Sequence, residues 1–184
     1  MAASKAHENR IHVMIRAGAV AILAVMCLAP QQARASGIAT IAAAYAGTWN
    51  TRIVHYKTTY SKPRTETSRL KNVCWNSAGY FACDQFVNGA SKALIVFTYD
   101  KSRNMYHTYD VPTDGSAATS GELLISGDTW VYPWQDKDGA KTVYLRVINT
   151  FVDSNTIRYR QEFSLDKRHW TVASAGIERR LSRS

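Results

Sequence analysis

The sequence predicts an all-β domain behind a helical export signal: an antiparallel up-and-down meander that closes into a barrel of about 8–10 strands. Short segments rich in Val, Ile, Thr and aromatic residues alternate with Gly, Asp, Asn and Pro sites along most of the chain. Within these segments apolar and polar residues alternate with a period of two, which is the strand period. The connections are short, so consecutive strands pair, and closure removes the exposed sheet edges.

The first 35 residues have the layout of a secretory signal peptide. Lys5, Arg10 and Arg16 precede the uncharged apolar run 17–29, and Ala33-Arg34-Ala35 follows it as a small-x-small site. The alternative of a membrane anchor is less favoured, because a helix that spans a bilayer needs roughly 20 apolar residues. We therefore predict cleavage near Ala35 and a periplasmic or secreted protein, with the membrane involved only through the export signal.

Cys27 raises the alternative of lipidation within that segment. A lipidated cysteine needs small residues directly before it, and Met26 is bulky. We interpret Cys27 as a small apolar residue of the signal peptide. The remaining chain divides into a lead-in segment, 36–45, and one β-barrel domain, 46–182.

The charge of the exported part excludes one class of partner. Residues 36–184 contain 19 Lys and Arg residues against 13 Asp and Glu residues, and the positive balance is scattered. A nucleic-acid binder needs a basic stripe with interleaved aromatic residues, which the sequence lacks. We expect no nucleic-acid partner; the oligomeric state is left open.

Two cysteines, Cys74 and Cys83, remain after processing. The segment between them reads as strand, turn and strand, which places the cysteines opposite each other on a hairpin. An even count in an exported protein favours a structural disulfide. A metal or redox pair is the alternative, but the spacing is longer than that of a redox pair.

The strand assignment follows from the turn residues, chiefly Asp, Asn and Gly sites such as Asn88-Gly89 and Asp136 to Gly139. We expect ten strands, at 48–60, 65–75, 79–88, 92–99, 104–111, 120–126, 129–135, 141–152, 156–165 and 169–180. The alternation predicts which side chains face the interior in the later strands. They are Trp130, Tyr132 and Trp134; Val143, Leu145, Val147, Asn149 and Phe151; and Ile157, Tyr159, Gln161, Phe163 and Leu165.

Gly47-Thr48-Trp49 opens the first strand, and Arg179-Arg180 ends the last. A Gly-x-Trp paired with a late Arg resembles the calycin superfamily, which includes lipocalins and fatty-acid-binding proteins. The resemblance implies that Trp49 plugs the closed end of the barrel with an arginine lying across its ring. Alternation from Ile177 selects Arg179 for that position, so Gly47, Trp49 and Arg179 are the expected structural residues.

The layout also resembles the uncharacterised bacterial lipocalin-like domains, in which a Phe-x-Tyr-Asp segment is followed by another Tyr. Here these are Phe97-Thr98-Tyr99-Asp100 and Tyr106. Such a barrel implies an interior cup lined by alternate residues. Its expected ligand is a small apolar or aromatic molecule.

Polar and aromatic side chains on the expected inward faces are the candidate ligand-binding residues. Each of them has an alternative role in the packed core or in bonding to a neighbouring strand. Pro133, beside the aromatic triplet, indicates an edge or a bulge. The candidates are His55, His107, Tyr109, Trp130, Tyr132, Trp134, Asn149 and Gln161.

No catalytic motif or metal-ligand spacing stands out, and no cofactor is expected. Haem held by His55 or His107 is an alternative, since nitrobindin-like calycins bind haem through a histidine. Glu122 and Asp84 are the carboxylates expected nearest to the cup. Three hypotheses remain, of which a non-enzymatic binding module is favoured. The second is an isomerase or hydrolase that uses the same cup, and an α+β cone is the other fold that could host it. The third is a filled barrel that binds envelope partners through its outer face.

Overall fold

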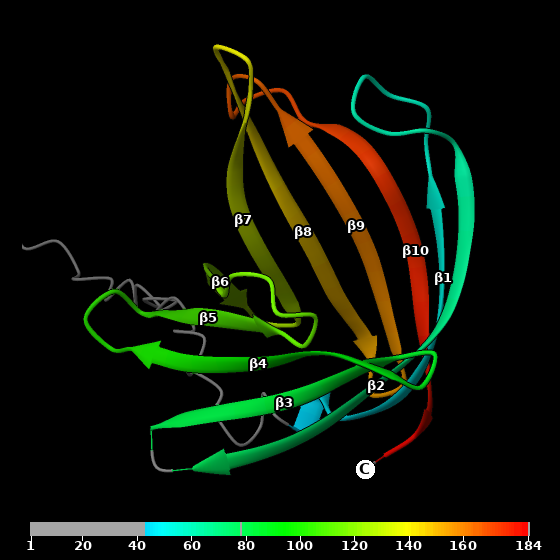
Figure 1. Ribbon diagram of the computed structural model, residues 1–184, viewed down its shortest axis with the longest axis vertical. Coiled ribbons are helices and arrows are strands. Elements are labelled where there is room, and N and C mark those ends of the chain that lie inside the picture. The colour runs from blue at the N-terminus through cyan, green and yellow to red at the C-terminus, as the bar shows by residue number, and fades with distance from the viewer. Residues whose placement is uncertain (1–42, 78, 184) are drawn as a thin grey trace, which may run out of the picture. The chain divides into compact units, whose positions relative to one another are not determined.

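The computed structural model describes residues 43–77 and 79–183, so the predicted signal peptide lies outside the described residues, as does most of the predicted lead-in segment. Figure 1 shows an all-β domain whose strands form a closed antiparallel barrel in the order β1-β10-β9-β8-β7-β6-β5-β4-β3-β2. The strands are β1 (Gly47–His55), β2 (Arg64–Ser77), β3 (Tyr80–Val87), β4 (Ala90–Asp100), β5 (Met105–Pro112), β6 (Thr119–Ser126), β7 (Thr129–Asp138), β8 (Lys141–Asp153), β9 (Thr156–Ser164) and β10 (Thr171–Ser182). None of the helical segments among these residues is long and apolar enough to cross a membrane.

The predicted up-and-down meander is confirmed, because every strand pairs with its neighbours in sequence and β1 closes the barrel against β10. Of the two turns named from the sequence, Asn88-Gly89 lies between strands, whereas most of the Asp136 to Gly139 segment belongs to β7, which ends at Asp138. Asn88 and Gly89 both have positive φ angles, 52° and 85°, as a two-residue hairpin requires. The first strand is the main departure in length: it ends at His55, and residues 56–63 form a loop.

The inward faces of β7, β8 and β9 are those that alternation predicts. Trp130 lies opposite Asn149, Tyr132 opposite Val147, and Val147 opposite Gln161. Leu165 is the exception, because β9 ends at Ser164 and the side chain of Leu165 is exposed.

The expectation that His107 and Tyr109 face the interior is wrong. The inward residues of β5 are Tyr106 and Thr108, which pair with Tyr99 and Phe97 of β4. Met105 and Tyr106 are both buried, so the start of β5 has two apolar faces and the sequence pattern does not show which one is inward.

Arg179 was also assigned to the wrong face, because β10 contains a β-bulge. The register slips between Val172 and Ser174, so Ala173 is an extra residue and every later side chain changes face. The guanidinium carbon of Arg180, not that of Arg179, lies 4.0 Å from the centre of the Trp49 ring.

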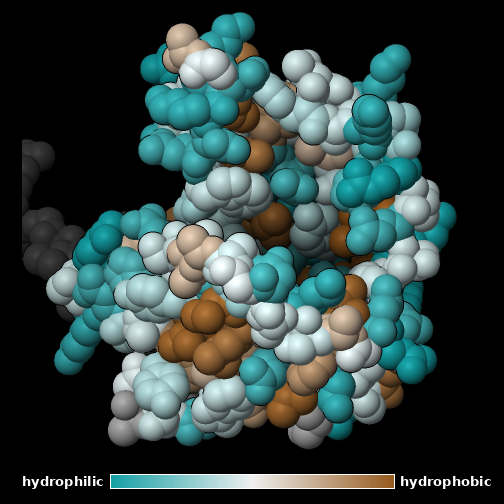
Figure 2. Space-filling view, in the orientation of Figure 1, coloured by the Kyte–Doolittle hydropathy of each residue, from teal (hydrophilic) through white to brown (hydrophobic). Residues whose placement is uncertain are grey.

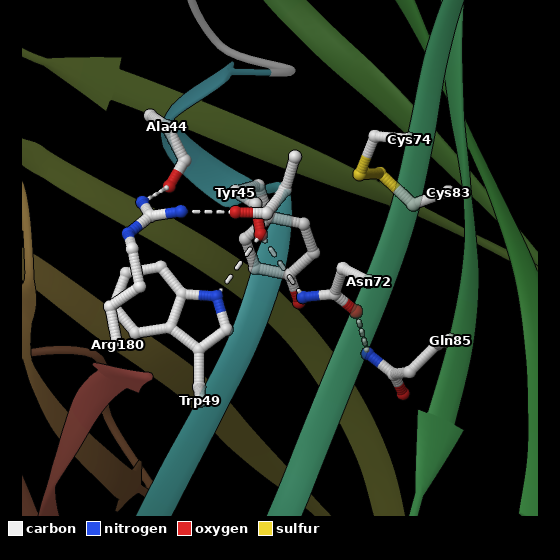
Figure 3. Close-up of a disulfide and its surroundings, with 9 residues drawn as sticks. Ala44, Tyr45, Trp49, Asn72, Cys74, Cys83, Gln85 and Arg180 are labelled. Carbon is white, nitrogen blue, oxygen red and sulfur yellow. Dashed lines mark hydrogen bonds between the residues drawn. A yellow bond between two sulfur atoms is a disulfide. The ribbon is translucent and has the colours of Figure 1, made fainter. Parts of the chain in front are cut away.

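Arg180 closes the end of the barrel at Trp49. Its Nη2 donates to the carbonyl of Ala44 (2.8 Å) and its Nη1 donates to the carbonyl of Ala46 (Figure 3). Its Nε donates to the carbonyl of Ser154 (2.8 Å). The guanidinium thus satisfies backbone acceptors from two separate segments, the residues before β1 and the β8–β9 connection. The side chain joins the entry to β1, the β8–β9 connection and the buried ring of Trp49.

Gly47 is required at this closed end for two reasons. Its φ angle is +118°, a conformation that other residues rarely adopt. An added Cβ would also lie 2.5 Å from the carbonyl oxygen of Ser182 and 2.9 Å from Nη1 of Arg180. The expected tight entry of the chain at Gly47 therefore brings the first and last strands into close contact.

Beside this plug, the barrel is filled by an aromatic core that includes Phe81, Phe97, Tyr106 and Trp130. The rings of Phe81 and Phe97 are stacked with centroids 4.0 Å apart. The predicted disulfide is present: Cys74 and Cys83 lie directly opposite each other on β2 and β3 and are bonded at the edge of this core (Figure 3).

The adjacent arginines allow a matched test of the closed end. Arg180→Gln should lower the free energy of unfolding by about 2–4 kcal/mol, because it removes charged hydrogen bonds to three carbonyls and a ring contact. Arg179→Gln should change it by no more than about 0.5 kcal/mol. Urea unfolding of both variants measures the difference, and equal losses would contradict the placement of Arg180.

The disulfide gives a second test. The Cys74→Ser/Cys83→Ser double variant should lose about 2–3 kcal/mol of stability, since the bond closes a short loop in the unfolded chain. Reduction of the wild-type protein should lower its free energy of unfolding in urea by the same amount. The reductant should leave the free energy of unfolding of the double variant unchanged. A wild-type protein insensitive to reduction would contradict the expectation.

Candidate functional site

The half of the interior that lies away from the aromatic core is the candidate binding site. Figure 2 shows the molecule hollowed between β7–β10 above and β3–β5 below, with hydrophobic side chains deep in the hollow. The inward residues Tyr132, Val147, Tyr159 and Gln161 are only partly buried, and Trp134 is 40% exposed. This part of the barrel is therefore open to solvent.

Glu178 is the most unusual group in this region. The bulge in β10 turns it inward, where it lies opposite Thr51 of β1 and Ile157 of β9 and is only 7% exposed. No described side chain forms a hydrogen bond or ion pair with its carboxyl. Burial raises the pKa of Glu178 from 4.5 to about 7, so the group changes its protonation state near neutral pH.

Three tyrosine hydroxyls lie within electrostatic reach of that carboxyl. Burial is the main cause that raises the pKa of Tyr45, Tyr132 and Tyr159, and the negative charge of Glu178 raises each pKa further. Residues 43–45 are helical and include Tyr45, while Tyr132 lies on β7 and Tyr159 lies on β9. The three tyrosines therefore come from separate parts of the chain, and Tyr45 packs against Phe97 and Trp130 of the aromatic core.

Besides Nε2 of His55, two buried polar atoms have no hydrogen-bond partner among the described residues: the hydroxyl of Tyr132 and Oδ1 of Asn149. Both belong to residues that the sequence analysis singled out. Leaving such atoms unbonded costs free energy. A bound molecule that offers a donor or acceptor would remove this cost, as would an ordered water. Gln161, by contrast, is bonded: its Oε1 accepts from Ser174 Oγ at 3.2 Å.

The loop 56–63 borders the mouth of the barrel. The hydroxyl of Tyr60 donates to Oδ2 of Asp138 at the tip of β7 (3.2 Å), and the Tyr60 ring meets Phe163 edge-on at 4.9 Å. A hollow of about 330 Å³ lies there, lined in part by His55, Tyr60 and Gln161. His55 faces this hollow with its Nε2 3.3 Å from Oε2 of Glu66.

The structure brings most of the predicted ligand-binding residues together. Tyr132, Trp134, Asn149 and Gln161 share the inner face of β7, β8 and β9, and His55 lies near the mouth. Trp130 lies on the same inner face but belongs to the aromatic core.

His107 and Tyr109 are separated from them on the outer face. His107 lies 3.7 Å from Asp100 there, and Tyr109 is 44% exposed, so of the two histidines considered for haem only His55 faces the interior. Among residues 43–77 and 79–183, no group of three His, Cys, Asp or Glu side chains is placed to hold a metal ion.

The carboxylates expected in the cup are outside it. Glu122 forms an ion pair with Arg103 at 3.1 Å, and Asp84 lies on the outward phase of β3. Glu178 was missed because strict alternation along β10 places it outward. Glu178 and Arg180 are two residues apart and share a face of β10, so choosing Arg180 as the partner of Trp49 in the sequence would have predicted an inward Glu178.

The charge inside the barrel is acidic. Glu178 and the half-buried Asp110 face the interior, and burial raises the pKa of Asp110 as well. Of the cations near the interior, Arg180 is bonded to backbone carbonyls, while Lys62 and Arg64 lie at the mouth, where Arg64 is 3.5 Å from Glu66. The interior therefore suits a neutral or cationic molecule better than an anionic one.

Glu178 predicts a pH dependence of stability. Its pKa is raised in the folded protein, so the folded state binds the proton more tightly than the unfolded chain does. Its stabilising contribution is complete below about pH 4.5 and is lost as the pH rises through about 7. The loss amounts to about 3 kcal/mol.

Glu178→Gln should remove this part of the pH dependence and should be more stable than the wild type at pH 8. Urea unfolding of the wild type and of Glu178→Gln between pH 4 and 8 measures the free energy of unfolding of each protein at each pH. Parallel pH profiles for the two proteins would show that Glu178 is not the group responsible.

Comparisons with known proteins assign no family to this chain. No family model and no curated protein matches the sequence. Among solved structures, the crystal structure of Rv2717c from M. tuberculosis is similar with a TM-score of 0.46 and 11% sequence identity, over 80% of this chain and 99% of that chain.

Proposed function

We propose that this protein is an exported, calycin-like barrel that binds a small apolar or aromatic molecule, neutral or cationic, in its interior. The observation that carries the proposal is the pair of unbonded buried atoms, the Tyr132 hydroxyl and Asn149 Oδ1, beside the aromatic residues of β7. A ligand with an apolar body and one or two polar groups satisfies those atoms while it covers the exposed ring of Trp134.

The closed end supports the calycin-like part of the proposal. Gly47, Trp49 and an arginine across the indole occur together at the point where the first and last strands meet. This is the arrangement that the sequence resemblance implies, with Arg180 in place of Arg179.

The export part of the proposal is supported by the composition of residues 1–35 and by the disulfide. Structural disulfides persist in oxidising compartments and are rare in the cytosol. The periplasm or the exterior of the cell is therefore the proposed location.

A variant that fills the interior tests the binding function. Val147 faces inward between Tyr132 and Gln161, whereas Val111 is exposed on the outer face of β5. With the neutral aromatic probe N-phenyl-1-naphthylamine, Val147→Trp should weaken binding by roughly tenfold or more by occupying the hollow. Val111→Trp, the matched control, should bind the probe as the wild type does.

Native mass spectrometry of the mature domain gives a second readout, since a retained small molecule should be absent from Val147→Trp. Equal probe affinity in both variants, with the fold intact by circular dichroism, would place binding elsewhere. Consistently empty wild-type protein without probe binding would favour the filled-barrel hypothesis.

Glu178 favours a second candidate function, an enzyme of the isomerase type. A buried carboxyl with a pKa of about 7 can both accept and donate a proton near neutral pH. Conversion of cyclohex-3-enone to the conjugated cyclohex-2-enone, followed by ultraviolet absorbance, is a direct assay. Turnover that disappears in Glu178→Gln would support the enzyme, whereas unchanged probe binding without turnover supports the binding module.

A further inference from the structure

The outer face of the barrel opposite the acidic interior carries a cluster of arginines. They lie on adjacent strands around a hollow of about 1210 Å³. We define the arginine face as the exposed residues Arg52 (β1), Arg69 (β2), Arg158 and Arg160 (β9) and Arg179 (β10).

Strand register places these side chains close together. In one row across the sheet, Arg52 lies opposite Ile177, and Ile177 lies opposite Arg158. In the next row, Asn50 lies between Arg69 and Arg179. Neighbouring strands are about 4.8 Å apart, so guanidinium groups from both rows can reach one bound anion.

Four of the five arginines have no acidic partner in the part of the chain that the structure describes. Only Arg160 is paired, with its Nε 2.8 Å from Oε1 of Glu162, a carboxylate that Arg146 also contacts at 2.6 Å. The charges of Arg52, Arg69, Arg158 and Arg179 are therefore available to an external anion. Guanidinium groups bind phosphate oxygens through paired hydrogen bonds.

The surface between the arginines is partly aliphatic, with Asn50, Thr67 and Thr150 as polar members of the same lining. Ile177 is 41% exposed and Leu181 is 51% exposed, and Val54, Ala175 and Ile148 continue the apolar lining of the hollow. Tyr159 is the one aromatic residue in this lining, and it belongs to the inward face of β9. Single-stranded nucleic acid binds through aromatic stacking, so these residues favour a ligand with an anionic head and an aliphatic chain.

We propose that the arginine face binds an anionic phospholipid, with its phosphate held by Arg52, Arg158 and Arg179 and its acyl chain lying over Ile177 and Leu181. This site is separate from the interior and binds a ligand of opposite charge. It does not depend on the proposed interior function.

Dihexanoyl phosphatidylglycerol, below its micellar concentration, is the test ligand, and isothermal titration calorimetry is the readout. Arg158→Gln/Arg179→Gln should weaken binding by roughly tenfold or more, because two charged hydrogen-bond donors are lost. Lys92→Gln/Lys101→Gln removes the same charge from exposed positions outside the hollow and should retain the affinity. Val147→Trp should also retain it, which separates this site from the interior.

Four further measurements distinguish the ligand class. Ile177→Gln should weaken the binding of the lipid but leave the binding of inorganic phosphate unchanged. Dihexanoyl phosphatidylcholine should bind the wild-type protein less tightly than dihexanoyl phosphatidylglycerol does. Equal affinity for inorganic phosphate and the lipid would overturn the role of the acyl chain. Tighter binding of a single-stranded oligonucleotide, or lipid binding unaffected by the arginine variant, would overturn the proposal.

Discussion

The bulge at Ala173 is the constraint on which the rest of this barrel depends. One extra residue in β10 reverses the faces of all the side chains that follow it. Arg180 and Glu178 turn inward as a result, and Ile177 and Arg179 turn outward. The plug over Trp49, the interior carboxyl and the arginine face all follow from this single slip in register.

Small side chains make the bulge and the tight curvature beside it possible. Ser174 is fully buried, and β10 approaches β1 so closely at Gly176 that an added Cβ would lie 2.3 Å from the carbonyl oxygen of Arg52. Larger residues at these positions would separate the strands. Close approach of the last strand to the first is what closure of the barrel requires, so the local sequence and the global topology agree.

The closed barrel also separates charge. Acidic groups face the interior, where burial raises the pKa of Glu178 and of Asp110, while unpaired arginines gather on the opposite face of the same strands. A sheet places successive side chains on opposite faces, so β10 contributes Glu178 to one surface and Arg179 to the other. Two ligands of different charge are therefore compatible with one small domain.

The sequence predicts the fold class, the strand positions and the disulfide because these depend on local signals: turn residues, alternation and hairpin spacing. It also predicts the inner face of β7 to β9, where one face is clearly more apolar. It fails for His107 and Tyr109, because the start of β5 is buried on both faces.

Prediction fails again at Arg179 and Glu178, because a bulge depends on how β10 meets its neighbours and leaves no distinct pattern of its own. Tyr45 was missed for a related reason: it lies in the lead-in segment, where no strand period marks a side chain as inward.

Thiol accessibility along β10 tests the central claim most directly. Ile177→Cys, Glu178→Cys and Arg179→Cys are each treated with a bulky charged methanethiosulfonate, and the rate of labelling is measured in the folded protein. Fast labelling at 177 and 179 and slow labelling at 178 is the result that the bulge predicts. Fast labelling at 178 with slow labelling at its neighbours would contradict the bulge. The inward position of Glu178 and the outward position of Arg179 would then both be wrong.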